Sequence, residues 1–197
     1  MKKIILVTVA TLSFNSAMAT TINFEDLAGD FITPVADGYN GLNWNSSNQT
    51  GVADINPFLM PGVDYTGLQN NALFNALGYL APNTTVITAT NGGTFDFLSG
   101  FWSAGITGNG SIQFEGYANN QLLFSSGIFN LDTNNVSPIV LNWFGMDSFQ
   151  ILSSANVWIA DNLGVNVSPS SVPLPGAAWL FASSILGFVA ARKRKML

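Results

Sequence analysis

The stretch Ser111-Ile112-Gln113-Phe114-Glu115-Gly116-Tyr117 alternates apolar and polar side chains. A period of two is that of a β-strand, in which successive side chains point to opposite faces. The alternation places Ile112 and Phe114 on one face and Gln113, Glu115 and Tyr117 on the other. It therefore predicts a strand that covers a core with one face and meets solvent with the other.

Other segments of similar character extend this prediction along the chain. They are rich in β-branched and aromatic residues and are separated by Gly, Asn, Asp and Pro; they are residues 94–102, 121–125, 139–144, 148–152 and 157–160. Asn119-Asn120 predicts a tight hairpin turn between two strands, because Asn tolerates a positive φ. Short strands at this spacing predict an all-β fold, either a jelly roll or a β-sandwich.

Residues 39–83 depart from the strand pattern, because Gly, Asn, Ser and Pro recur among them. We expect long surface loops here, with residues 68–80 as the one part of the body whose apolar spacing fits a helix. Binding residues concentrate in loops on a rigid β-scaffold. Loops that only face solvent would fit the same composition.

The N-terminus has the layout of a secretory signal. Lys2 and Lys3 precede an apolar run, residues 4–12, and Ala17-Met18-Ala19 forms a small-x-small cleavage site. This order of charge, apolar run and small residues predicts a signal peptide over residues 1–19, cleaved after Ala19. The body, residues 20–167, would then be exported.

The C-terminus has the layout of a membrane anchor. A short Ser/Pro linker, residues 168–171, is followed by a Pro motif and an uncharged run, residues 176–191. The chain then carries the basic cluster Arg192, Lys193, Arg194 and Lys195. The uncharged run predicts a transmembrane helix with its basic tail in the cytoplasm.

The same C-terminal residues carry a family resemblance. Val172, Pro173, Leu174 and Pro175, followed by a small-residue helix and the basic tail, resemble the PEP-CTERM sorting signal in its VPLPA-like variant. The chain differs from the commoner Pro-Glu-Pro by Leu174 and from VPLPA by Gly176. The resemblance implies that residues 172–197 are a sorting segment, processed near the Pro motif by an exosortase. It also implies a Gram-negative bacterium, with delivery to its cell surface or its exopolysaccharide or biofilm matrix.

Charge is distributed unevenly and excludes several kinds of chemistry. Residues 20–171 hold all 11 acidic residues of the chain and none of its Lys or Arg, and the chain has no His or Cys. A Ser-His-Asp triad, a Cys nucleophile, a Schiff-base lysine and a His/Cys zinc site are therefore excluded from the body. Nucleic acid is not an expected partner, because binding to phosphates rests on Lys and Arg. We predict a protein without catalytic activity, with a hydrolase using carboxylates alone as the remaining enzymatic alternative.

Oxygen-bearing side chains near both ends of the body are candidate calcium ligands. Glu25 and Asp26 follow the first predicted strand, and Asp161 and Asn162 end the last one, so pairing of the terminal strands would bring them together. Clustered oxygens suit Ca²⁺. The alternative is that each caps a turn by bonding to its own backbone. A loop at residues 132–135 is similarly rich in oxygen atoms.

Aromatic residues with polar neighbours are candidate sugar platforms. Tyr39, Trp44 and Tyr65 lie among Gly and Asn, whereas Trp102, Trp143 and Trp158 lie in predicted strands and are expected in the core. The sequence as a whole predicts a structural or binding role in exopolysaccharide or biofilm. The alternative is a calcium-dependent carbohydrate-binding module.

Overall fold

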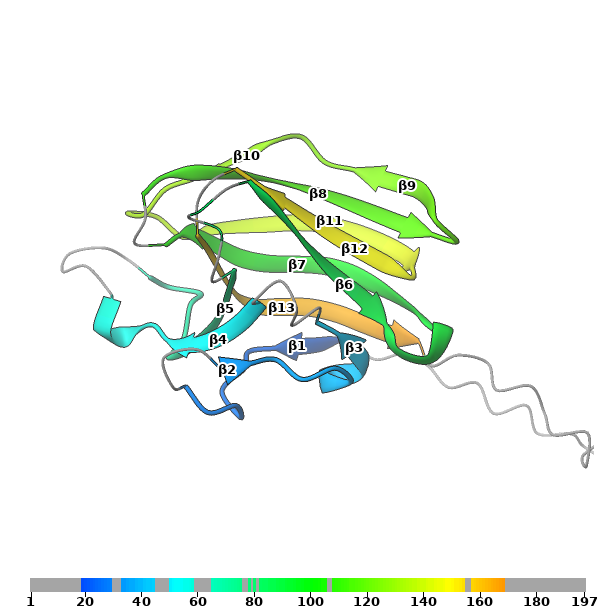
Figure 1. Cartoon of the computed structure of the whole chain (residues 1–197), viewed down its shortest axis with the longest axis horizontal. Helices are drawn as coiled ribbons and strands as arrows, with labels where there is room; N and C mark the ends of the chain where they lie inside the picture. Colours follow the sequence, from blue (N-terminus) through cyan, green and yellow to red (C-terminus); the bar gives the residue numbers. More distant parts are fainter. Residues whose placement is uncertain are drawn as a thin grey trace, which may run out of the picture.

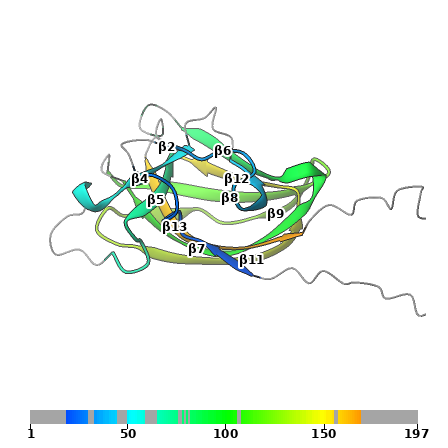
Figure 2. The same ribbon diagram turned by 90° about the horizontal axis from the view of Figure 1, so that it is seen from below.

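The computed structural model describes residues 19–29, 33–44, 50–58, 65–75, 78, 80, 82–105, 108–154 and 157–168. Within these ranges, antiparallel strands form two sheets that pack face to face around one apolar core (Figure 1). Seen from below, β7 and β11 lie in one layer and β8 and β12 in the other (Figure 2). The all-β prediction is confirmed, in the form of a β-sandwich.

The larger sheet holds the longest strands and both ends of the body. In spatial order its strands are β11 (Ser137–Met146), β7 (Thr94–Ala104), β13 (Trp158–Ser168), β5 (Asn71–Asn75), β4 (Thr50–Asp54) and β2 (Thr33–Pro34). The strand β1 (Thr20–Ile22) also pairs with β13, beside β5. The terminal strands of the body therefore pair, as the calcium hypothesis requires.

The smaller sheet is built around the strand that contains residues 111–117. Its order is β10 (Phe129–Leu131), β8 (Gly110–Ala118), β12 (Ser148–Ser153), β6 (Asn83–Ala89) and β3 (Leu42–Asn43), and β9 (Gln121–Ser125) also pairs with β8. Short 3₁₀ turns are η1 (Tyr39–Gly41), η3 (Asn56–Phe58) and η4 (Thr90–Gly92). Connections such as β6 to β7 and β7 to β8 pass from one sheet to the other.

The alternation in β8 is realised as predicted. Ile112 is 1% exposed and Phe114 is fully buried, while Gln113, Glu115 and Tyr117 keep part of their surface in solvent. The ring of Phe114 lies 4.9 Å from that of Trp102 and 5.4 Å from that of Phe149, measured between centroids. Aromatic packing between the sheets thus forms the centre of the core.

The predicted hairpin is also confirmed. Asn119 and Asn120 have φ angles of 51° and 61°, and the residues that flank them, Ala118 and Gln121, pair in register. Two consecutive residues with positive φ match the twist of the flanking strands. The predicted strands at 94–102, 139–144, 148–152 and 157–160 lie within β7, β11, β12 and β13, except that Val157 precedes β13.

The prediction for residues 39–83 is wrong in part. This region contains β3, β4 and β5, and residues 71–75 form a strand rather than part of a helix. Asn75 is fully buried, and its Oδ1 accepts a hydrogen bond from the Trp158 N–H at 2.8 Å. Asn71 is 8% exposed and donates from Nδ2 to the Leu27 carbonyl at 2.9 Å. These polar residues resemble loop sequence, but they are internal hydrogen-bonding partners.

Several sequence predictions fall outside the described residues. These are the signal peptide up to residue 18, with Ala17, most of the linker, and the sorting segment with its basic tail; Ala19 is described and exposed. Among the residues that the structure does describe, no helix is long and apolar enough to cross a membrane.

Candidate functional site

Pairing of β1 with β13 brings two of the predicted acidic residues to one place. Ile22 pairs with Leu163, and the chain then turns through Phe24, whose φ is 57°, into Glu25. Asp161 lies within β13, between the part that pairs with β1 and the part that pairs with β5, and not at the strand's end as predicted. Glu25 is close enough to Asp161 to raise the pKa of that carboxyl by charge repulsion.

Both carboxylates bind the segment that leads into β5. Asp161 accepts a hydrogen bond from the Gln69 N–H at 2.7 Å, and Glu25 accepts one from the Asn71 N–H at 2.9 Å. Asp161 is fully buried, and burial raises its pKa to about 7, against the lowering effect of hydrogen bonds from two backbone N–H groups. With no Lys or Arg between residues 20 and 171, no cationic side chain of the body offsets this repulsion.

The other two predicted calcium ligands have different partners. Asp26 accepts a hydrogen bond from the Tyr39 hydroxyl at 2.6 Å, and Asn162 donates from Nδ2 to the Gly67 carbonyl at 2.9 Å. In the described ranges, no group of three or more His, Cys, Asp or Glu side chains could hold a metal ion. The structure therefore brings Glu25 near Asp161, while the side chains of Asp26 and Asn162 are hydrogen-bonded to Tyr39 and Gly67.

The predicted sugar platforms are mostly used for packing. Trp44 is fully buried and donates from Nε1 to the Tyr39 carbonyl at 2.9 Å, so its ring has no free face for a sugar. The Tyr39 ring stacks on Phe24 at 5.9 Å, and burial and the bond to Asp26 raise the pKa of the Tyr39 hydroxyl. Tyr65 is half-buried. Trp102 and Trp158 are fully buried in the core, as predicted, whereas Trp143 is only partly buried and packs against the edge of the core.

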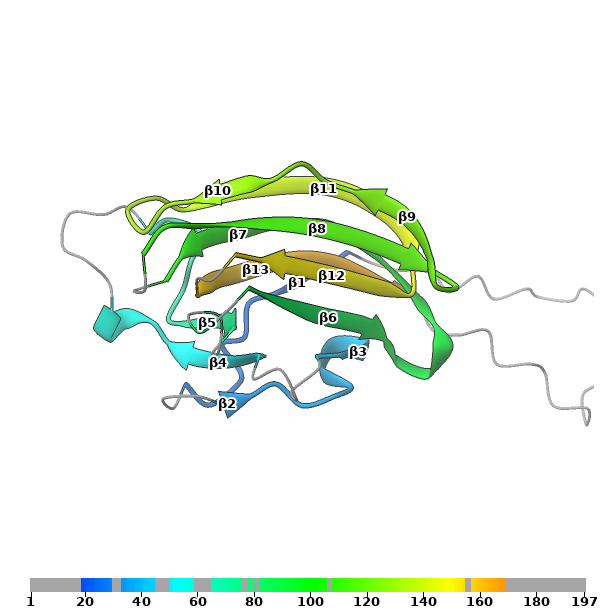
Figure 3. The same cartoon turned by 45° about the horizontal axis from the view of Figure 1, so that its top comes forward.

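A strip of polar side chains crosses the outer face of the smaller sheet. Strand register places Glu115 opposite Gln150, and Tyr117 opposite Ser148. Ser148 in turn pairs with Thr88, which pairs with Asn43. We define the polar face as the partly exposed residues Asn43, Thr88, Gln113, Glu115, Tyr117 and Gln150. Figure 3 shows its strands β8, β12, β6 and β3 side by side.

Hydrogen bonds hold several side chains of the polar face in place. The Tyr117 hydroxyl donates to the Glu115 carboxylate, and this bond raises the pKa of Tyr117. Gln113 donates from Nε2 to the Ser125 hydroxyl at 3.1 Å. From β8 to β3 the strip spans three strand spacings, roughly 14 Å. One aromatic ring, three amides, a threonine hydroxyl and a carboxylate on a rigid sheet form a surface suited to a hydroxyl-rich ligand.

A shallow pocket of about 590 Å³ lies between the loops at one end of the sandwich. Its polar lining includes Asn109, Ser111, Asp132 and Ser154. Asp132 comes from the oxygen-rich loop noted in the sequence, and hydrogen bonds from Asn134 lower its pKa. Among the residues that the structure describes, those that line the pocket include no aromatic side chain.

Comparisons with known proteins find only distant likenesses. No family model matches the sequence, and no curated protein matches it. Among solved structures, the CBM22-1-CBM22-2 tandem domain of Paenibacillus barcinonensis Xyn10C is similar over 84% of this chain and 49% of its own, with 10% identity and a TM-score of 0.48. This chain therefore spans about half the length of that protein. The single CBM22-1 xylan-binding domain matches over 81% of this chain and 100% of its own, with 8% identity and a TM-score of 0.45.

A third similar structure is TmCBM61 in complex with β-1,4-galactotriose. It matches over 74% of this chain and 94% of its own, with 9% identity and a TM-score of 0.35. Likenesses at these identities and TM-scores assign no function to this chain. The function proposed below rests on the chain's own residues.

Proposed function

We propose that this chain is an exported β-sandwich, anchored in the membrane until its sorting segment is processed, that binds a neutral polysaccharide across the polar face of its smaller sheet. The observation that carries the proposal is the register of β8 and β12. It places Glu115 opposite Gln150, with Tyr117 two residues further along β8 on the same face. Sugar hydroxyls need paired donors and acceptors, and a sugar ring packs on an aromatic side chain. The polar face offers both kinds of contact.

The charge of the body supports a neutral ligand and a role without catalysis. Residues 20–171 carry 11 acidic and no basic side chains, so an anionic polymer would be repelled. The same composition lacks the imidazole, thiol and amine groups on which most catalytic sites depend. Export rests on residues 1–19, and anchoring and exosortase-type sorting rest on residues 172–197, as the sequence predicts.

Replacing Tyr117 by Ala is expected to weaken polysaccharide binding at least tenfold, because truncating an aromatic ring at a binding site costs more than about 1.4 kcal/mol. The full chain in detergent would be run by affinity electrophoresis through gels containing xylan, β-1,4-galactan or alginate. We expect retardation by a neutral polymer, none by anionic alginate, and a loss of retardation in the Tyr117→Ala variant.

The pocket supplies the matched control for this test. Asn109→Ala removes a polar side chain from the pocket and should leave retardation unchanged. If Asn109→Ala abolishes binding and Tyr117→Ala does not, the ligand binds in the pocket. If no neutral polymer retards the full chain, the proposed function is wrong.

A second candidate function is calcium-dependent stabilisation at Glu25 and Asp161. It is favoured by the half-buried Glu25 lying near the fully buried Asp161, two carboxylates that repel each other without a cationic side chain. Calcium takes six to eight oxygen ligands, so main-chain carbonyls or water would have to complete a site that has two carboxylates. The two residues therefore fit a calcium site in charge and only partly in ligand number.

Millimolar Ca²⁺ is expected to raise the melting temperature of the full chain by about 5 °C over that in chelator, because an ion bound only by the native state adds to stability. Glu25→Gln should remove this rise. Asp132→Asn, a change of similar chemistry in a distant oxygen-rich loop, should keep it. Equal melting temperatures with calcium and chelator would exclude this second candidate.

A further inference from the structure

The two ends of the described body lie at the same end of the sandwich. Thr20, the first residue of β1, pairs with Val165, and Ser168, the last residue of β13, pairs with Thr94. The pocket loops lie at the opposite end, where Ser153 pairs with Asn83 and Ile112. We call the end that contains Thr20 and Ser168 the exit end.

The C-terminal end of β11, at Met146, lies beside the exit end. Phe95 of β7 pairs with Val167 on one side and with Met146 on the other. Asp96 links the same strands, since its carboxylate accepts from the Gly145 N–H at 2.9 Å and from Asn166 Nδ2 at 3.1 Å. The end of β11 is therefore two strand spacings, roughly 10 Å, from the point where the chain leaves the sandwich.

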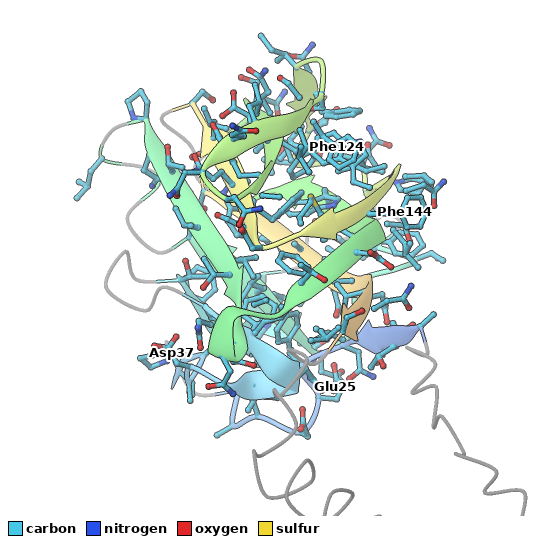
Figure 4. The ribbon with its side chains drawn as sticks, turned by 90° about the vertical axis from the view of Figure 1, so that its right-hand side faces the viewer. Glu25, Asp37, Phe124 and Phe144 are labelled. Carbon is cyan, nitrogen blue, oxygen red and sulfur yellow. The ribbon has the colours of Figure 1, made fainter. Side chains whose placement is uncertain are left out.

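An apolar patch covers this part of the molecule. Leu122, Leu123 and Phe144 are 52%, 47% and 57% exposed. Between β9 and β11, the rings of Phe124 and Trp143 stack at 5.3 Å with an interplanar angle of 15°, joining the edges of the two sheets. We call these five residues the edge patch. Figure 4, which views this side of the molecule, shows Phe124 and Phe144 in the same half of the sandwich, with Glu25 and Asp37 in the other half.

The backbone of β11 is poorly suited to pairing with a strand of a second copy. Its register against β7 shifts between Val140 and Trp143 and again between Trp143 and Met146. Asn142 and Gly145 have φ angles of 53° and 72°. Bulges of this kind interrupt the regular ladder that strand addition requires. The apolar side chains of the patch are therefore better explained by a partner that needs no strand register.

The chain beyond the sandwich indicates what that partner is. The uncharged run that the sequence predicts to be membrane-spanning begins at Gly176, eight residues after Ser168. Eight extended residues reach at most about 26–29 Å. If this run spans the bilayer, as the proposed function holds, the exit end cannot leave the vicinity of the lipid surface. Exposed aromatic and aliphatic side chains are favoured at the interface between lipid and water.

We propose that the edge patch rests on the lipid surface and orients the sandwich on the membrane. This inference depends on the membrane anchoring in the proposed function. Because residues 20–171 carry only acidic charge, the contact is apolar and should be stronger on zwitterionic than on anionic lipid.

The absence of Cys from the chain allows a single fluorescent label to report lipid contact. An environment-sensitive dye would be attached to Gln121→Cys, which is exposed beside the patch, or to Leu80→Cys, which is 63% exposed. Leu80 precedes Asn83 at the opposite end and supplies the control. The full chain would be reconstituted into phosphatidylcholine vesicles with or without quencher-bearing lipid.

We expect lipid quenching at position 121 to exceed that at position 80 at least threefold. Adding Leu123→Ser and Phe144→Ser should reduce it, as should vesicles containing phosphatidylserine. If the chain floats with the vesicles but both labels are quenched equally, the patch does not contact lipid and the anchor stands. If the chain does not float with the vesicles, the predicted membrane anchoring is wrong, and so is the lipid contact that depends on it.

Discussion

Replacing Phe114 by Ala is expected to lower the free energy of unfolding by about 3–5 kcal/mol, the cost of removing a large aromatic side chain from a packed core. Phe114 is fully buried. Its ring contacts Trp102 of the larger sheet at 4.9 Å and Phe149 of the smaller sheet at 5.4 Å. Deleting it therefore leaves a cavity where the two sheets meet. Urea unfolding of the full chain in detergent, followed by tryptophan fluorescence, measures the effect.

Phe144→Ala is the matched control, because it deletes the same side chain from a position that is 57% exposed. Its cost should stay below about 1 kcal/mol, since surface substitutions leave no cavity. Similar losses in the two variants would contradict the core described here. A loss confined to one of two separate transitions would contradict a single cooperative sandwich.

The stability of the chain in chelator is expected to fall by about 2–4 kcal/mol as the pH rises from 4 to 8. The pKa of Asp161 is raised from 3.8 to about 7 by burial and by repulsion from Glu25. A carboxyl whose folded pKa is raised favours the folded state while it is protonated, and this contribution is lost as pH rises from the unfolded pKa through the folded one. Each pH unit across that interval costs up to about 1.4 kcal/mol.

Asp161→Asn supplies the test of this assignment. The variant cannot ionise, so its unfolding free energy should change little between pH 5 and 7. Its absolute stability should be lower at low pH, because an amide replaces one of the two oxygens that accept from the Gln69 and Asn162 N–H groups. A slope equal to that of the unchanged chain would assign the pH dependence to another group. Calcium that removes the slope of the unchanged chain would support the second candidate function.

Part of the candidate site could be predicted from the sequence. Alternation in residues 111–117 placed Gln113, Glu115 and Tyr117 on the solvent face of one strand, and the structure confirms that face. Gln150 joins them because β12 pairs with β8 in one register. That pairing joins residues 35 positions apart, and no local pattern in the sequence encodes it. The alternation of residues 148–152 predicts that Gln150 lies on the solvent face of its strand. It does not predict which strand lies beside it.

The buried polar residues are the part of the structure that the sequence did not predict. Asn71, Asn75 and Asp161 resemble loop residues in composition, yet they are buried and satisfied by hydrogen bonds from or to distant segments. Their burial depends on strands that meet only in the folded chain. The prediction of Trp44 as a sugar platform is wrong for the same reason, since its ring packs on Phe24 in the core although its neighbours in sequence are polar.

The sequence by itself determined the strand periods, the Asn119-Asn120 turn, the lack of catalytic cations in the body and the layout of the two ends, because each depends on residues close together in the chain. Only the tertiary structure decided that Glu25 lies near Asp161, that Gln150 lies beside Glu115, and that the edge patch adjoins the exit end. These arrangements arise from strand pairing and sheet packing across long separations. They are fixed by the shared burial of apolar faces rather than by local conformational preference.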